Sequence, residues 1–131
     1  MRIVVDTNVI VSALMNTNGT PAKILSLISN KKLKILYDNR IIFEYIDVLS
    51  RKEFGFPNET IDDLFNSYKH DGEYINSDFI KANFSDESDK KFYEVYKTGN
   101  AEYLITGNIK HFPKEKNIVT VREFLGIYEA K

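Results

Sequence analysis

Residue types that build several common kinds of site are scarce or absent in this chain of 131 residues. It contains no cysteine, which excludes disulfide bonds and thiolate metal sites and is compatible with a reducing compartment. Its two histidines, His70 and His111, show no metal-ligand spacing, so we expect neither of them to bind a metal ion. Metal chemistry in this protein would therefore have to use oxygen ligands.

The chain also lacks a strong net charge and long hydrophobic runs. With 18 basic and 19 acidic side chains the net charge is −1, which excludes the broad positive field of non-specific nucleic-acid binders, so an anionic partner must be held locally. The N-terminus reads as a strand, RIVV, followed by an acid, and not as the apolar stretch of a signal peptide. We expect one soluble, cytoplasmic domain spanning residues 1–131, without membrane association.

Hydrophobic periodicity predicts strands that alternate with helices. The expected strands are 2–6, 33–37, 73–75, 103–106 and 118–121. The expected helices are 8–15 with Asn8 as its cap, one opening at Thr20-Pro21, 38–51 capped by Asp38, 58–69, one capped by Asp86 or Ser85 that runs to Thr98, and a C-terminal helix with a capping box of Thr120 and Glu123. This alternation implies parallel strands joined by right-handed crossovers, and therefore an α/β fold: a three-layer α/β/α sandwich around a central parallel sheet.

Two of the expected strands are followed by polar side chains. The stretch RIVVDTN places Asp6 directly after the first strand, and AEYLITGN places Asn108 just beyond the fourth. Ligands of open parallel sheets bind beyond the carboxyl ends of the strands. We therefore expect Asp6 and Asn108 to lie at a binding edge of the sheet.

Two further acids are expected to point toward the core. In the helix 38–51, a step of about 100° per residue places Glu44 at the border of the apolar stripe beside Val48, with Asp47 further out on the polar side. In the helix that begins near Asp89, this acid shares a face with Phe92. A carboxylate directed toward a core requires a partner.

Each of these residues also has an ordinary structural explanation. Glu44 could pair with Arg40 four positions earlier, Asp89 could complement the helix dipole, Asp6 could cap the next helix, and Asn108 could belong to a simple turn. Taken singly, these explanations are the commoner ones, because caps and surface charges outnumber ligands. The four residues as a set favour a shared site.

A shared site for three carboxylates has an electrostatic consequence. Two carboxylates about 4 Å apart repel by about 4 kcal/mol at an effective dielectric constant near 20, so three close pairs cost roughly 12 kcal/mol. This rivals the whole stability of a domain, about 5–15 kcal/mol. Protons or a divalent cation must relieve the repulsion, and oxygen ligands alone favour Mg²⁺ or Mn²⁺. Such an ion can activate a water molecule and stabilise the charge on a scissile phosphate.

The motifs VVDTN, IIFEYIDVL, DESDKKFYEVY and AEYLITGN, in this order over roughly residues 1–112, resemble the PIN domain family, in particular its single-domain, toxin-like bacterial and archaeal type. The resemblance implies a three-layer α/β/α fold and a Mg²⁺- or Mn²⁺-dependent ribonuclease acting on RNA phosphodiesters. It assigns catalysis and metal binding to Asp6, Glu44 and Asp89, with Thr7 and Asn8 as the usual neighbours of the first acid. It also implies a cognate antitoxin and a homodimer.

Asn108 departs from the family pattern, because much of the family has a fourth acid at this position. Three acids form three repulsive pairs where four would form six, so the empty site should be less strained and should bind metal more weakly. An amide oxygen can still bind a cation or a metal-bound water, so we expect activity to survive. We also expect Thr7 and Thr106 to brace the carboxylates through hydrogen bonds.

Several basic residues lie near the expected site. Lys90, Lys91, Lys110 and Lys114 are candidates for contacts to RNA phosphates, and solubility is the alternative role for each of them.

Three other functions begin with similar features. A phosphatase with an aspartyl nucleophile needs a second acid two residues after Asp6, where Asn8 stands, and a receiver-type phosphoacceptor needs a lysine after the last strand, where the chain has Val121 and Arg122. The remaining alternative is a PIN-like module that binds RNA or a protein partner without catalysis.

Overall fold

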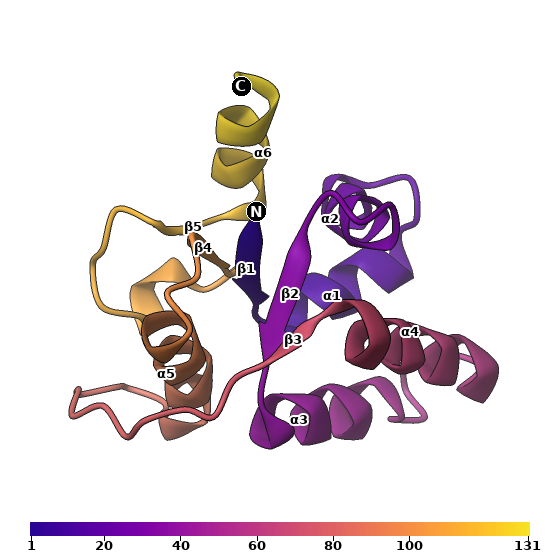
Figure 1. Cartoon of the computed structure of the whole chain (residues 1–131). Helices are drawn as coiled ribbons and strands as arrows, with labels where there is room; N and C mark the ends of the chain where they lie inside the picture. Colours follow the sequence, from indigo (N-terminus) through magenta and orange to yellow (C-terminus); the bar gives the residue numbers. More distant parts are fainter.

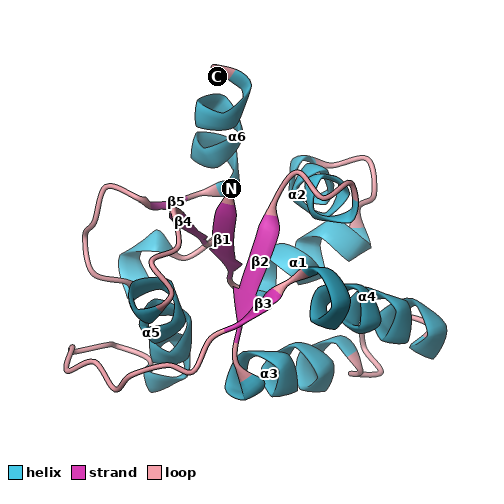
Figure 2. Cartoon of the chain, in the orientation of Figure 1, coloured by secondary structure: helices cyan, strands magenta, loops and turns pink.

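The computed structural model describes residues 1–131 and contains strands that alternate with helices (Figures 1 and 2). The strands are β1 (Arg2–Val5), β2 (Lys34–Tyr37), β3 (Glu73–Tyr74), β4 (Tyr103–Ile105) and β5 (Ile118–Val119). The α-helices are α1 (Thr7–Met15), α2 (Thr20–Ser29), α3 (Asn39–Leu49), α4 (Asn58–Asp71), α5 (Lys90–Thr98) and α6 (Val121–Glu129). Two short 3₁₀ helices, η1 (Glu87–Asp89) and η2 (Ile109–His111), complete the chain and were not predicted from the sequence.

All five strands are parallel, in the order β3-β2-β1-β4-β5. The chain starts at the centre with β1, moves outward through β2 and β3, and returns to the other side of β1 for β4 and β5. The winding direction therefore reverses between β1 and β4, whose carboxyl ends lead into Asp6 and Thr106. Such a reversal is where open α/β sheets bind ligands.

The helices form a layer on each face of this sheet. Helix α5 covers one face, where it packs on β1, β2 and β4, and Figure 1 shows α1, α2 and α4 on the opposite side. Residues Ile3, Val4 and Val5 are fully buried, as expected for a strand covered on both faces. The predicted three-layer α/β/α sandwich with a central parallel sheet is confirmed.

Of the four predicted helix caps, two are confirmed, one is wrong, and one caps a different helix. The last is Asp86, which caps the short 3₁₀ helix η1, while α5 itself begins at Lys90. The Asp38 carboxylate accepts a hydrogen bond from the backbone N–H of Ile41, and Thr120 and Glu123 form a complete capping box. Asn8, however, does not cap α1. The helix already begins at Thr7, because the backbone N–H of Asp6 is still bonded to the sheet through Ile105 and no loop separates the strand from the helix.

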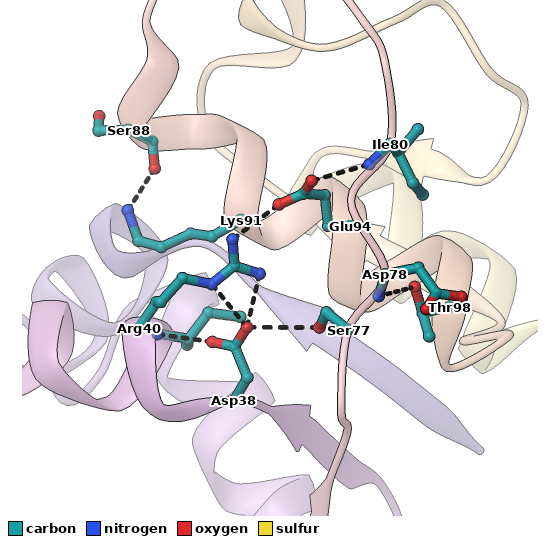
Figure 3. A network of polar contacts seen from close by, with 10 residues as sticks. Asp38, Arg40, Ser77, Asp78, Ile80, Ser88, Lys91, Glu94 and Thr98 are labelled. Carbon is teal, nitrogen blue, oxygen red and sulfur yellow. Dashed lines mark hydrogen bonds and ion pairs between the residues drawn. The ribbon is translucent and has the colours of Figure 1, made fainter.

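A long segment, residues 75–86, carries the chain from the sheet edge at β3 to α5 on the other face (Figure 1). It is anchored by a polar network centred on Arg40, shown in Figure 3. The guanidinium lies 2.6 Å from Asp38 and 2.7 Å from Glu94, and the second oxygen of Glu94 accepts from the backbone N–H of Ile80 at 2.9 Å. The network joins this segment to α3 and α5.

No helix combines the length and the apolar character that crossing a lipid bilayer requires.

Candidate active site

One cavity of about 290 Å³ lies at the carboxyl ends of β1 and β4. All three acids predicted as metal ligands line it. We call it the acidic cavity, and its polar lining consists of Asp6, Thr7, Asn8, Glu44, Arg51, Asp86, Ser88, Asp89, Asn108 and His111. These residues come from β1–α1, from α3 and the turn after it, from the segment before α5 and from the loop after β4. Four regions far apart in the sequence therefore meet at the point where the sheet reverses direction.

Asp6 is the most deeply buried acid of the cavity, with only 3% of its surface exposed. Its Oδ2 accepts a hydrogen bond of 2.7 Å from the Thr106 hydroxyl, which in turn accepts from the backbone N–H of Asn108 at 3.0 Å. Burial raises the pKa of Asp6 to about 6; the Thr106 hydrogen bond opposes this rise, and the charges of Asp89 and Glu44 add to it. Asp6 therefore holds its negative charge at a cost in folding free energy.

Glu44 projects from α3 into the cavity and has two partners. One carboxylate oxygen accepts a hydrogen bond from the Thr7 hydroxyl, and the other lies 2.6 Å from the ammonium of Lys91. The alternative pairing of Glu44 with Arg40 is wrong, because the Arg40 guanidinium is engaged by Asp38 and Glu94. A helical i, i+4 contact is weak and gives way to these buried carboxylates.

Asp89 lies at the N-terminus of α5, as predicted, but its side chain makes no capping bond to that helix. Its Oδ2 lies 3.2 Å from Nδ1 of His111. Burial, with a smaller contribution from Asp86, raises the pKa of Asp89, and His111 opposes the rise. Asp86 itself caps η1 by accepting from the backbone N–H of Ser88. The carboxylate of Asp89 is therefore directed to the cavity and not to its own helix.

His111 also lines the acidic cavity, which was not predicted from the sequence. It reaches Asp89 because η2, a turn of only three residues, folds the loop after β4 back over the cavity. Hydrophobic periodicity does not detect so short an element.

The four candidate lysines occupy different places. Lys91 contacts Glu44, and Lys90 lies with its ammonium 4.3 Å from the centre of the Phe79 ring. Lys110 and Lys114 line a second cavity of about 390 Å³, next to η2. Only Lys91 of the four forms an ion pair with an acid of the acidic cavity.

Comparison with known proteins identifies the family of this chain. Residues 2–110 match the sequence model of the PIN domain. The chain belongs to the PIN domain family. It is also 31% identical to an uncharacterized protein of Methanocaldococcus jannaschii, MJ1680, over 130 residues, which cover 94% of this chain and 76% of that protein. PIN domains are generally nucleases and typically depend on divalent metal ions.

The donor set of this PIN domain fits a hard divalent ion, because the acids, threonine hydroxyls and the Asn108 amide of the cavity supply oxygen atoms. As the side chains lie, no group of three Asp, Glu or His residues is arranged to hold an ion. Glu44 is engaged by Lys91, and Asp89 by His111. Joint binding of an ion by the three acids would therefore require some of these side chains to turn.

Proposed function

We propose that this PIN domain is a Mg²⁺- or Mn²⁺-dependent endoribonuclease that hydrolyses RNA phosphodiesters. The observation that carries the proposal is the convergence of Asp6, Glu44 and Asp89 on one cavity at the switch point of the sheet. The fold does not require three acids from three separate elements at this place. Their mutual repulsion opposes such a cluster.

In this proposal the three acids hold the ion, and the residues around them keep the acids in place. The Thr106 hydroxyl orients Asp6, and the Thr7 hydroxyl orients Glu44. When bound, a divalent ion supplies an activated water molecule and neutralises charge on the scissile phosphate. Asn8 and Asn108 offer further polar groups at the cavity wall.

Substrate contacts must be local, because the net charge of the chain is only −1. In this proposal Lys110 and Lys114, which line the second cavity beside η2, contact RNA phosphates. Lys90 and Lys91 are the other candidates, and Lys91 would first have to leave Glu44.

The Asp89→Ala variant tests the proposal. We expect the wild-type protein to cut single-stranded RNA only when Mg²⁺ or Mn²⁺ is present, and the variant to be slower by about a thousandfold, the loss expected when about 4 kcal/mol of transition-state stabilisation disappears. Gel analysis of a labelled RNA measures both rates. Asp63→Ala, which removes an exposed acid of α4, is the matched control and should keep the wild-type rate. Full activity of Asp89→Ala would refute the assignment.

Asn108→Asp tests the departure from the family pattern. The added carboxylate should strengthen Mn²⁺ binding about tenfold, because the cavity gains an anionic ligand, and wild-type activity should already be measurable. Calorimetric titration with Mn²⁺ and the RNA cleavage assay measure the two effects. A wild type that stays inert while Asn108→Asp cuts RNA would mean that the natural site is inactive.

We also propose that the protein is the toxin of a toxin–antitoxin pair and forms a homodimer. Support comes from the resemblance to the single-domain, toxin-like type. Expression of the wild type should arrest growth of a bacterial host, whereas Asp89→Ala should not.

Light scattering of the purified protein should give twice the mass of one chain.

A binding module without catalysis is the second candidate. It is favoured by the pairing of Glu44 and Asp89 with Lys91 and His111, and by the amide at position 108. A protein that binds RNA but shows no Mn²⁺ binding in calorimetry would fit this candidate and not the nuclease.

A further inference from the structure

Lys91 places a positive charge where the proposed nuclease needs a metal ion. Its ammonium lies 2.6 Å from Glu44 Oε1 and also donates to the backbone carbonyl of Ser88. The Lys91 side chain is only 13% exposed, and Figure 3 shows it extended toward Ser88. An ammonium this well enclosed, with two partners, belongs to the interior of the site and not to the solvated surface.

We propose that Lys91 is an internal counter-ion that competes with the divalent cation for Glu44, so that ion binding displaces Lys91. The inference rests on the proposed metal-dependent function, since it assigns Lys91 a role toward that ion. In the ion-free protein Lys91 neutralises one of the crowded acids; in the loaded protein its ammonium is released at the rim of the cavity, where an RNA phosphate would approach.

The charges of the cavity support this role. Asp6, Glu44, Asp86 and Asp89 bring four carboxylates to its wall, and Glu44 is the only one of them with an ammonium partner. The other oxygen of Glu44 is held by the Thr7 hydroxyl, so Lys91 occupies the one remaining carboxylate oxygen. An incoming cation must share Glu44 with Lys91, whose like charge repels it, or replace Lys91.

The neighbouring lysine provides a matched control. Lys90 has the same side chain one position earlier, but its ammonium lies over the Phe79 ring and forms no ion pair. Removing Lys90 therefore removes one positive charge from the same turn of the helix without changing the partners of Glu44.

Mn²⁺ affinity of the full chain tests the competition. Calorimetric titration should show about tenfold tighter binding to Lys91→Met than to wild type, equivalent to about 1.4 kcal/mol, and no more than a twofold change for Lys90→Met. In the presence of EDTA, Lys91→Met should melt below the wild type, and Mn²⁺ should raise its melting temperature by more than it raises that of the wild type. Unchanged or weaker Mn²⁺ affinity of the folded Lys91→Met protein would overturn the proposal.

A measurement on the wild type keeps the proposal testable if Lys91→Met does not fold. Acetylation of lysines, followed by mass spectrometry, should modify Lys91 several times faster with saturating Mn²⁺ than with EDTA, while Lys90 reacts at the same rate in both. Equal protection of Lys91 in the Mn²⁺-bound protein would refute displacement. Absence of Mn²⁺ binding in wild type and variants alike would overturn the proposed function together with this inference, an outcome distinct from binding that Lys91→Met leaves unchanged.

Discussion

Replacing Asp6 by asparagine should abolish RNA cleavage and at the same time stabilise the ion-free protein at neutral pH. Asp6 is 3% exposed, and burial raises its pKa to about 6, against the effect of Thr106 and with the help of Asp89 and Glu44. An amide of the same shape can still accept from the Thr106 hydroxyl but carries no charge. We expect the free energy of unfolding at pH 7 to rise by about 3 kcal/mol. Urea unfolding in EDTA measures it.

The pH dependence of this gain identifies its cause. The pKa of Asp6 is higher in the folded state than its ordinary value of 3.8, so the folded protein binds the proton more tightly than the unfolded chain does. As the pH rises from about 4 to about 6, the free energy of unfolding of the wild type falls, because the buried Asp6 carboxyl has to become charged. The difference in the free energy of unfolding between Asp6→Asn and wild type should therefore be smallest near pH 3.5 and should reach its full size above pH 6.

Comparing the two proteins at each pH cancels the contributions of their other titrating groups. Asp63→Asn, at an exposed position of α4, should change stability by less than about 0.5 kcal/mol at every pH. A gain that is the same at pH 3.5 and pH 7, or a wild type more stable than Asp6→Asn at pH 7, would contradict the explanation.

Replacing Arg40 by methionine should destabilise the fold by about 3 kcal/mol or more. Arg40 neutralises the carboxylates of Asp38 and Glu94, whose side chains are only 8% and 4% exposed. Without the guanidinium, two carboxylates remain buried, and removing one partner of a buried ion pair typically costs about 3–5 kcal/mol. The segment around Ile80, which is bonded to Glu94, should lose its anchor as well. Urea unfolding measures the first effect and hydrogen exchange of residues 76–82 the second.

Arg51→Met is the control for this experiment. Arg51 is as exposed as Arg40, 51% against 49%, but its partner Asp47 is itself 75% exposed. Such a helical surface pair contributes about 0.3–0.5 kcal/mol. Because the two arginines match in exposure, the difference between the variants reports the burial of the partner carboxylates. Equal losses for Arg40→Met and Arg51→Met would show that the network does not anchor the segment.

The parts of the site that follow from regular structure could be predicted from the sequence. A buried parallel strand directs the next residue to the carboxyl edge of the sheet, which is where Asp6 lies. The helical period placed Glu44 at the border of the apolar face of α3, and the structure shows it half-buried at the cavity. These inferences depend only on the helical and strand periodicities of the backbone. Most errors at the ends of elements amount to one or two residues. The start of α5 is the exception: the α-helix begins at Lys90 and not directly after Asp86, because the 3₁₀ helix η1 comes first.

The partners of these acids could not be predicted in the same way. Lys90 and Lys91 are identical in type and adjacent in sequence. Because of the tertiary packing, Lys90 contacts Phe79 and Lys91 contacts Glu44. Arg40 has an acid four residues away in Glu44, but its guanidinium binds Glu94, fifty-four residues further along the chain. A long, flexible basic side chain pairs with the carboxylates that tertiary packing buries near it. Local sequence does not determine which carboxylates these are.

A crystal soaked in Mn²⁺, with the anomalous signal of manganese recorded, tests the central claim most directly. The claim is that Asp6, Glu44 and Asp89 together hold a divalent cation in the acidic cavity. We predict a manganese peak in this cavity with an oxygen of each acid at ligand distance and with Lys91 moved away from Glu44. A cavity without a peak at saturating Mn²⁺, with Glu44 still paired to Lys91, would contradict the account.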